Sequence, residues 1–111
     1  MNVIRWLTGC FSDRGKAMSL YKRGMKKAKN HDHQGAIDDY TQTIGVADTP
    51  PDVKAMVLYN RALVYVASGE KQKGVDDLDA VLAMDDAPVN VKTMARNKLV
   101  RMESRTKKTK V

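Results

Sequence analysis

The sequence matches itself when residues 16–50 are placed on residues 54–88, and this internal repeat restricts the possible folds more than any other feature. In this alignment, which we call the repeat register, residues 36–39 fall on 74–77 and the linker 48–50 falls on 86–88. Four positions before these segments also match: Lys16 and Lys54, Met18 and Met56, Tyr21 and Tyr59, and Arg23 and Arg61. A third, partial copy begins at residues 92–94. A period of this length is typical of repeat proteins, whose units bury their apolar faces against one another.

Each unit divides into two helices at residues that interrupt a helical pattern. Residues 30–33 (Asn-His-Asp-His) separate the helices of the first copy, and residues 68–70 (Ser-Gly-Glu) separate those of the second. Gly69 is expected to end its helix in the left-handed conformation, and Thr49 to be the N-cap of the next helix, with proline at the first helical position. The pattern predicts an all-α fold with helices near residues 13–29, 33–46, 51–68, 71–84 and 88–104.

A chain of 111 residues fits a single domain. The predicted organisation is an N-terminal apolar and basic segment at residues 1–12, a repeat domain at 13–104 and a disordered basic tail at 105–111. Within the repeat domain we expect repeat one at residues 16–50, repeat two at 54–88 and a capping helix at 88–104.

The two units resemble the tetratricopeptide repeat (TPR) family, and the resemblance covers residues 16–102. The alternation of large and small residues typical of that motif is carried by Leu20, Gly24, Ala36, Tyr40 and Ile44, and then by Leu58, Ala62, Tyr65, Gly69, Leu78 and Leu82. Two features depart from the family pattern: the period is longer than the family's, and Gly74 stands where alanine is usual. The resemblance implies tandem helix-turn-helix repeats that form a short right-handed α-solenoid with a C-terminal capping helix.

The first helices of such repeats line a concave groove, so the resemblance also implies a binding surface. The residues expected to line this groove are Met18, Tyr21, Lys22, Met25, Lys29, Met56, Tyr59, Asn60, Leu63 and Lys98. Methionine adapts to the shape of a partner, and tyrosine adds contact area with a polar tip. We therefore expect this groove to bind a peptide or a protein.

The net charge of +7 is distributed in three blocks. Basic residues outnumber acidic ones by 8 to 1 in residues 1–30 and again in 91–111, whereas acidic residues outnumber basic ones by 11 to 4 in 31–90. The groove side is expected to collect Lys22, Lys26, Lys29, Arg61, Lys98 and Arg101, and the back of the repeats Asp38, Asp39, Asp76, Asp77 and Asp79. A basic groove with an acidic back favours an acidic partner and argues against a uniformly basic nucleic-acid binder.

Sequence patterns that carry catalysis or bind cofactors are not evident. His31 and His33 flank Asp32 in an inter-helix turn and lack a third ligand for zinc. Neither a phosphate-binding loop nor a dinucleotide fingerprint nor a nucleophile elbow occurs in the sequence. We therefore expect a non-enzymatic protein–protein interaction scaffold without a cofactor and without a metal.

The N-terminal segment 1–12 leaves alternatives open. Its apolar residues Val3, Ile4, Trp6, Leu7 and Phe11 could pack on the first repeat as a cap, or could rest at a lipid surface. Residues 7–10 resemble a lipobox, but Arg5 interrupts the apolar run that an export signal requires. The expected location is cytoplasmic. A peripheral membrane adaptor, a basic nucleic-acid-binding protein and self-association into a homo-oligomer stay open as alternatives.

Overall fold

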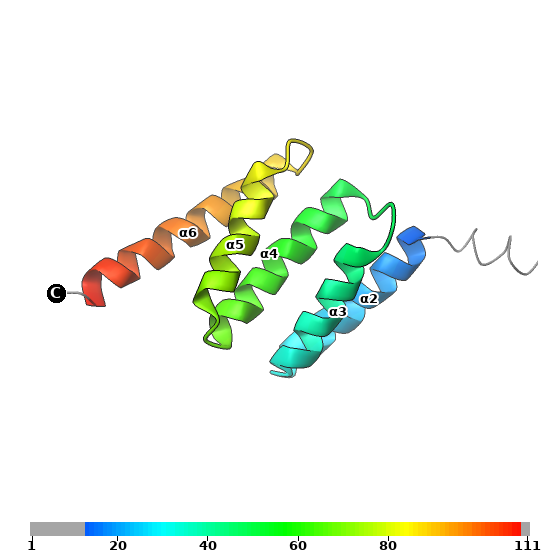
Figure 1. The fold of residues 1–111 in the computed structure, drawn as a ribbon, viewed down its shortest axis with the longest axis horizontal. Helices are drawn as coiled ribbons and strands as arrows, with labels where there is room; N and C mark the ends of the chain where they lie inside the picture. The colour runs from blue at the N-terminus through cyan, green and yellow to red at the C-terminus, as the bar shows by residue number, and fades with distance from the viewer. Residues whose placement is uncertain (1–12, 110–111) are drawn as a thin grey trace, which may run out of the picture.

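The computed structural model describes residues 13–109, and all of their regular structure is helical (Figure 1). Its five helices are α2 (Asp13–Lys29), α3 (His33–Gly45), α4 (Pro51–Ala67), α5 (Lys71–Ala83) and α6 (Val89–Thr109). No strand occurs in this part of the chain. The all-α fold predicted from the sequence is confirmed. The first four helices begin at the predicted residues, and their ends lie within one residue of the prediction.

The helices pack as two hairpins and a final helix, placed side by side (Figure 1). The hairpins are α2 with α3 and α4 with α5, and they contact each other mainly between α3 and α4. Helix α6 packs on α5 and also contacts α4, just as α4 contacts α2. The molecule therefore has two layers, one of α2, α4 and α6, and the other of α3 and α5.

The turns inside the two hairpins have the same backbone geometry. Gly69 and His31 are equivalent in the repeat register, and both have a positive φ, of 90° and 62°. In each turn the next residue donates a backbone hydrogen bond of 2.8 Å back into the preceding helix, from Asp32 to Lys27 and from Glu70 to Tyr65. These bonds are the six-to-one bonds of a Schellman motif. The left-handed helix end predicted at Gly69 is confirmed.

The side chain of Thr49 caps the end of α3 instead of the start of α4. Its hydroxyl donates to the backbone carbonyl oxygens of Val46 at 2.7 Å and Thr43 at 3.1 Å. The N-cap of α4 is Pro50, which makes no side-chain cap, and Pro51 follows at the start of the helix. The prediction of Thr49 as the N-cap is therefore wrong. The last turn of α3 leaves carbonyl oxygens without helical partners, and the threonine hydroxyl satisfies them.

Helix α6 is longer than the sequence pattern predicted. It continues to Thr109, so residues 105–109 extend the helix where a disordered tail was expected. Neither glycine nor proline occurs after Pro88, so nothing in the sequence interrupts the helix. Residues 110–111 lie outside the described part of the chain.

The residues of the hydrophobic core form two clusters that Ile44 joins. The first cluster lies mainly between α3 and α4 and consists of Ala36, Ile37, Tyr40, Val53, Val57 and Val64. The second cluster joins α4, α5 and α6 and consists of Ala55, Leu58, Tyr59, Ala62, Leu78, Val81, Ala87, Val91, Ala95 and Met102. Because the clusters meet at Ile44, the two hairpins share one continuous core.

The unusual glycine at position 74 is explained by its neighbour Val66. A Cβ atom built on Gly74 would lie 2.6 Å from Val66 Cγ2 and 3.0 Å from the carbonyl oxygen of Ala62. The equivalent pair in the first repeat is Ala36 and Ala28. The two repeats thus fill the same space, once with two alanines and once with a glycine and a valine.

Both ends of the helix stack are mainly polar at positions that are apolar inside it. Toward the preceding helices, α4 presents the buried residues Val53, Val57 and Val64, and α6 presents Val91, Ala95 and Met102. The equivalent residues of α2 are Gly15, Ser19 and Lys26, which are exposed. On its other side, α6 has Thr93, Arg96, Val100 and Ser104 at the positions of Ala55, Leu58, Ala62 and Val66. The two ends are therefore mainly polar, and Val100, which is 59% exposed, is the apolar exception on α6.

Three expectations fall on residues outside the described part of the chain. They are the coverage of the N-terminal segment 1–12, its contact with a lipid surface and the lipobox at residues 7–10. Within the described helices, none is both long enough and apolar enough to span a bilayer.

Candidate partner-binding face

The two hairpins are each held by an arginine that crosses between the layers. In the second hairpin, Arg61 of α4 binds the carboxylate of Asp77 on α5 through two hydrogen bonds, both of 2.7 Å. Asp77 is only 6% exposed. Arg61 also donates to Thr41 Oγ1 at 3.0 Å, and its guanidinium lies 5.5 Å from the centre of the Tyr65 ring. The hydrogen bonds to Asp77 are the main cause that raises the pKa of Arg61.

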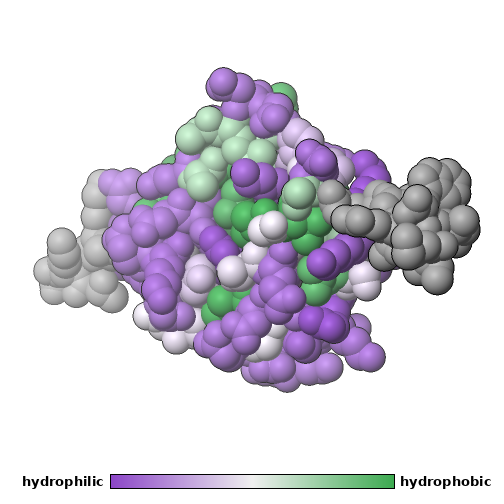
Figure 2. All heavy atoms as spheres, turned by 45° about the vertical axis from the view of Figure 1, so that its right-hand side comes forward, coloured by the Kyte–Doolittle hydropathy of each residue, from purple (hydrophilic) through white to green (hydrophobic). Residues whose placement is uncertain are grey.

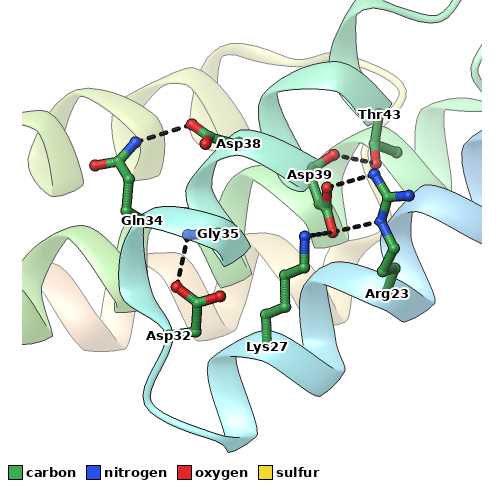
Figure 3. A network of polar contacts seen from close by, with 8 residues as sticks. All are labelled: Arg23, Lys27, Asp32, Gln34, Gly35, Asp38, Asp39 and Thr43. Carbon is green, nitrogen blue, oxygen red and sulfur yellow. Dashed lines mark hydrogen bonds and ion pairs between the residues drawn. The ribbon is translucent and has the colours of Figure 1, made fainter.

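The equivalent contact in the first hairpin joins Arg23 to Asp39 (Figure 3). The two hydrogen bonds measure 2.8 and 2.9 Å, and Lys27 adds an ion pair of 3.1 Å to the same carboxylate. Asp39 is 1% exposed, and Thr43 Oγ1 donates to its backbone carbonyl oxygen at 2.8 Å. The hydrogen bond from Arg23 is the main cause that lowers the pKa of Asp39, against the opposing effect of burial.

These ion pairs correct part of the expected charge distribution. Arg61 was expected on the groove side, and Asp39 and Asp77 on the back of the repeats. All three instead lie between the layers, because a carboxylate buried there requires a cationic hydrogen-bond donor. The exposed carboxylates of α3 and α5 are Asp38, Asp76 and Asp79.

A second set of basic residues has no such compensation. Lys22, Lys26 and Lys29 of α2 are exposed and form no ion pair with any described residue. On α6, Arg101 is exposed and Lys98 is half-buried, and neither forms an ion pair with a described residue. The basic residues of α2 therefore divide into a pair that binds Asp39 and a group that forms no ion pair with a described residue.

Four of these five residues, namely Lys22, Lys29, Lys98 and Arg101, share a surface with the predicted groove residues. One residue advances about 100° around a helix, so Met18, Tyr21, Lys22, Met25 and Lys29 lie on one stripe of α2. The equivalent stripes are Met56, Asn60, Leu63 and Ala67 on α4, and Met94, Asn97, Lys98 and Arg101 on α6. We call these three stripes together the open face, because each of them includes residues that are exposed to solvent.

A hydrogen bond joins two helices of the open face. Asn60 Nδ2 on α4 donates to the hydroxyl of Tyr21 on α2 at 2.8 Å. The Tyr21 ring also lies against Tyr40, with 6.1 Å between the ring centres. Burial raises the pKa of Tyr21 more than the hydrogen bond from Asn60 lowers it. Tyr21 and Asn60 therefore serve as a contact between repeats as well as part of the surface.

The predicted groove residues differ in how far solvent reaches them. Lys22, Met25 and Lys29 are exposed, and Met25 at 39% is one of three exposed large hydrophobic residues in the described chain. The half-buried residues are Met18, Tyr21, Met56, Asn60, Leu63 and Lys98. Tyr59 is only 9% exposed and belongs to the core cluster with Ala55 and Leu58. Tyr59 thus contributes packing and offers little surface to a partner.

Asn97 is a member of the open face that the predicted groove residues left out. It falls on the position of Tyr21 and Tyr59, one period further along, and it is exposed. The repeat register was the signal that could have identified it.

The side of the molecule nearer α2 and α3 is mostly hydrophilic, with hydrophobic residues between the polar ones (Figure 2). A shallow pocket of about 390 Å³ lies between α2 and the end of α3, and Lys16, Leu20, Gln42, Gly45, Val46 and Ala47 line it. This pocket has one charged residue and lies outside the open face.

Chemistry that requires clustered ligands has no counterpart in the described residues. Among them, no group of three histidine, cysteine, aspartate or glutamate side chains is placed to hold a metal ion. His31 is exposed in the first hairpin turn, and His33 is half-buried at the start of α3.

Comparison with known proteins gives no relative of this chain. Neither a protein-family model, nor a curated protein, nor a solved structure matches it.

Proposed function

We infer that the chain is a short right-handed α-solenoid of TPR-like repeats and that it is a non-enzymatic scaffold. In this proposal the open face binds an acidic peptide or an acidic segment of a protein. Two hairpins with equivalent turns and equivalent ion pairs, one repeat apart in the sequence, support the solenoid arrangement.

The separation of compensated from uncompensated basic residues carries the functional proposal. Arg23, Lys27 and Arg61 bind buried carboxylates, so they contribute to the packing of the two layers. Lys22 and Lys29 have no described acidic partner and lie beside the exposed Met25. A surface that combines uncompensated cations with an adaptable apolar side chain suits a partner with acidic and apolar residues.

The exposed acidic residues lie on the other layer, so the two sides of the molecule differ in charge. Asp38, Asp76 and Asp79 are exposed on α3 and α5. An approaching acidic partner is repelled by this layer and attracted by the open face, so electrostatic steering favours one side of the molecule.

The membrane-adaptor alternative depends on residues 1–12, which lie outside the described part of the chain, and it stays a prediction. For the nucleic-acid alternative, unspecific binding of single strands relies on exposed aromatic rings that stack on bases. Helices α2 and α4 contain three tyrosines: Tyr21 and Tyr65 are half-buried, and Tyr59 is buried. The open face therefore suits an acidic peptide better.

An NMR titration tests the proposal. The probe is an acidic peptide of alternating aspartate and leucine, and the control is the same peptide with lysine in place of aspartate. We expect the acidic peptide to shift amide signals of α2, α4 and α6 and the control to leave them unchanged. Equal binding of the lysine peptide, or shifts confined to α3 and α5, would contradict the proposal.

A further inference from the structure

The open face has basic residues at both ends and neutral residues in the middle. Its first row across α2, α4 and α6 is Lys22, Asn60 and Lys98. The second row is Met25, Leu63 and Arg101, and Lys29 on α2 is equivalent to Ala67 on α4. Because α4 supplies the central residue of both rows, the basic residues of α2 (Lys22 and Lys29) and those of α6 (Lys98 and Arg101) form two separate clusters.

Helix packing sets the distance between these clusters. Helices in close contact lie about 8–10 Å apart. Helix α4 lies between α2 and α6 and has few contacts with either, so α2 and α6 are at least about 16–20 Å apart. An extended peptide advances about 3.3 Å per residue, so about six residue steps span this distance. A ligand that reaches both clusters therefore has two acidic groups separated by at least about five residues.

Residues of α4, together with Met25, favour certain residues in the part of the peptide that lies between its two acidic groups. Leu63 is half-buried at the centre of the second row, and Met25 beside it is 39% exposed. Asn60 lies in the first row with its Nδ2 bonded to Tyr21, and its side-chain carbonyl oxygen is an acceptor that a peptide N–H could use. Leu63 and Met25 suit an apolar side chain of a bound peptide, and Asn60 suits its polar backbone.

We propose that the partner segment is an extended peptide with two acidic clusters at least about five residues apart and an apolar residue between them. This inference rests on the proposed function, and it adds the spacing that the partner must have. A nucleic acid fits the arrangement less well, because its charges follow one another at every nucleotide and would place phosphates over the neutral centre.

Three probes of comparable charge test the spacing. The first is a peptide with two aspartates, five neutral residues with a central leucine, and two further aspartates. The second has the same composition with all four aspartates adjacent, and the third is a short single-stranded oligothymidylate. Fluorescence anisotropy measures the affinity of each probe for the full chain.

We expect the spaced peptide to bind about tenfold more tightly than the clustered one, because only the spaced peptide reaches both clusters. Equal affinity of the two peptides would overturn the spacing and leave the proposed function standing. Binding of neither peptide would overturn both proposals. Tighter binding of the oligothymidylate than of the spaced peptide would overturn the assignment of a peptide partner.

Substitutions in the two clusters provide a second test. Lys29→Gln and Arg101→Gln each remove one charge from opposite ends, and we expect each to weaken the spaced peptide about tenfold. The matched controls are Lys16→Gln on α2 and Lys54→Gln on α4, which are exposed and lie outside the open face. Circular dichroism confirms that each variant is folded. If Arg101→Gln leaves the affinity for the spaced peptide unchanged while Lys29→Gln abolishes it, the ligand uses one cluster and the inference is wrong.

Discussion

Gly24 of α2 lies directly against the ring of Tyr40 on α3. A Cβ atom built on Gly24 would lie 2.7 Å from Cε1 and 2.8 Å from Cδ1 of that ring. Tyr40 is 1% exposed, so its ring has little room to move. The equivalent pair of the second repeat is Ala62 and Leu78. In each pair, the volumes of the small residue and the large residue therefore compensate for each other.

The first prediction concerns this pair. Gly24→Ala should destabilise the protein by about 1–3 kcal/mol, because the overpacking exceeds the gain of about 1 kcal/mol from the higher helix propensity of alanine. Adding Tyr40→Leu to Gly24→Ala gives the alanine and leucine of the second repeat, and it should recover most of the lost unfolding free energy. Urea unfolding of the two single variants and the double variant measures the coupling. Purely additive effects would show that the two residues do not share the space.

The second prediction compares the two interlayer arginines. Arg61→Gln should lower the free energy of unfolding by about 2 kcal/mol, because it removes charge-assisted hydrogen bonds from a buried carboxylate. Arg23→Gln should cost less, because Lys27 still pairs with Asp39. Lys54→Gln on the exposed side of α4 is the control and should have little effect. Equal losses for the two arginine variants in chemical denaturation would contradict the role assigned to Lys27.

The third prediction concerns the hairpin turns. His31 has a φ of 62°, a conformation that Gly69 adopts in the equivalent turn. His31→Gly should raise the stability by about 0.5–1 kcal/mol, because glycine reaches the left-handed region without steric cost. Gly69→Ala should lower it by a similar amount. Thermal unfolding followed by circular dichroism gives both values, and a destabilised His31→Gly variant would show that the imidazole makes a contact that outweighs the strain.

The fourth prediction is a pH dependence that Asp39 causes. Its pKa is lowered in the folded state, so the unfolded chain binds the proton first as the pH falls. The contribution of the ion pair is complete above about pH 4, the ordinary value of an aspartate, and is lost as the pH falls through the lower folded pKa. Asp39→Asn should flatten the decline in unfolding free energy below this pH. Asp79 is exposed, so the control Asp79→Asn should retain this decline. An unchanged decline in Asp39→Asn would refute the assignment of the pH dependence to Asp39.

The sequence predicted the helices well because their ends are set by local signals. Gly69 and the Asn30–His33 turn interrupt the helical pattern, and the two equivalent turns have the same hydrogen bonds. Thr49 was assigned to the wrong helix, because its hydroxyl can reach either the end of α3 or the start of α4. That choice depends on the path of the two prolines after it, which the sequence alone does not give.

The surface was harder to predict than the fold. The repeat register identified the residues that share a face, but it did not show that Arg61 turns toward Asp77 or that Tyr59 is buried. Both depend on how closely neighbouring helices approach. A charge count separated basic from acidic segments, but it could not separate the cations that bind Asp39 from those that form no ion pair with a described residue.

The most direct test of a binding role for the open face is the association rate of the spaced acidic peptide, measured by stopped-flow fluorescence at low and at moderate salt. One variant carries Lys22→Glu, Lys29→Glu and Lys98→Glu, and the control carries Asp38→Lys, Asp76→Lys and Asp79→Lys on the other layer. In the open-face variant, association should be about tenfold slower and should lose its salt dependence, because the steering charges are removed. The control should bind at least as fast as the natural chain. Loss of binding in the control together with unchanged binding in the open-face variant would contradict the account.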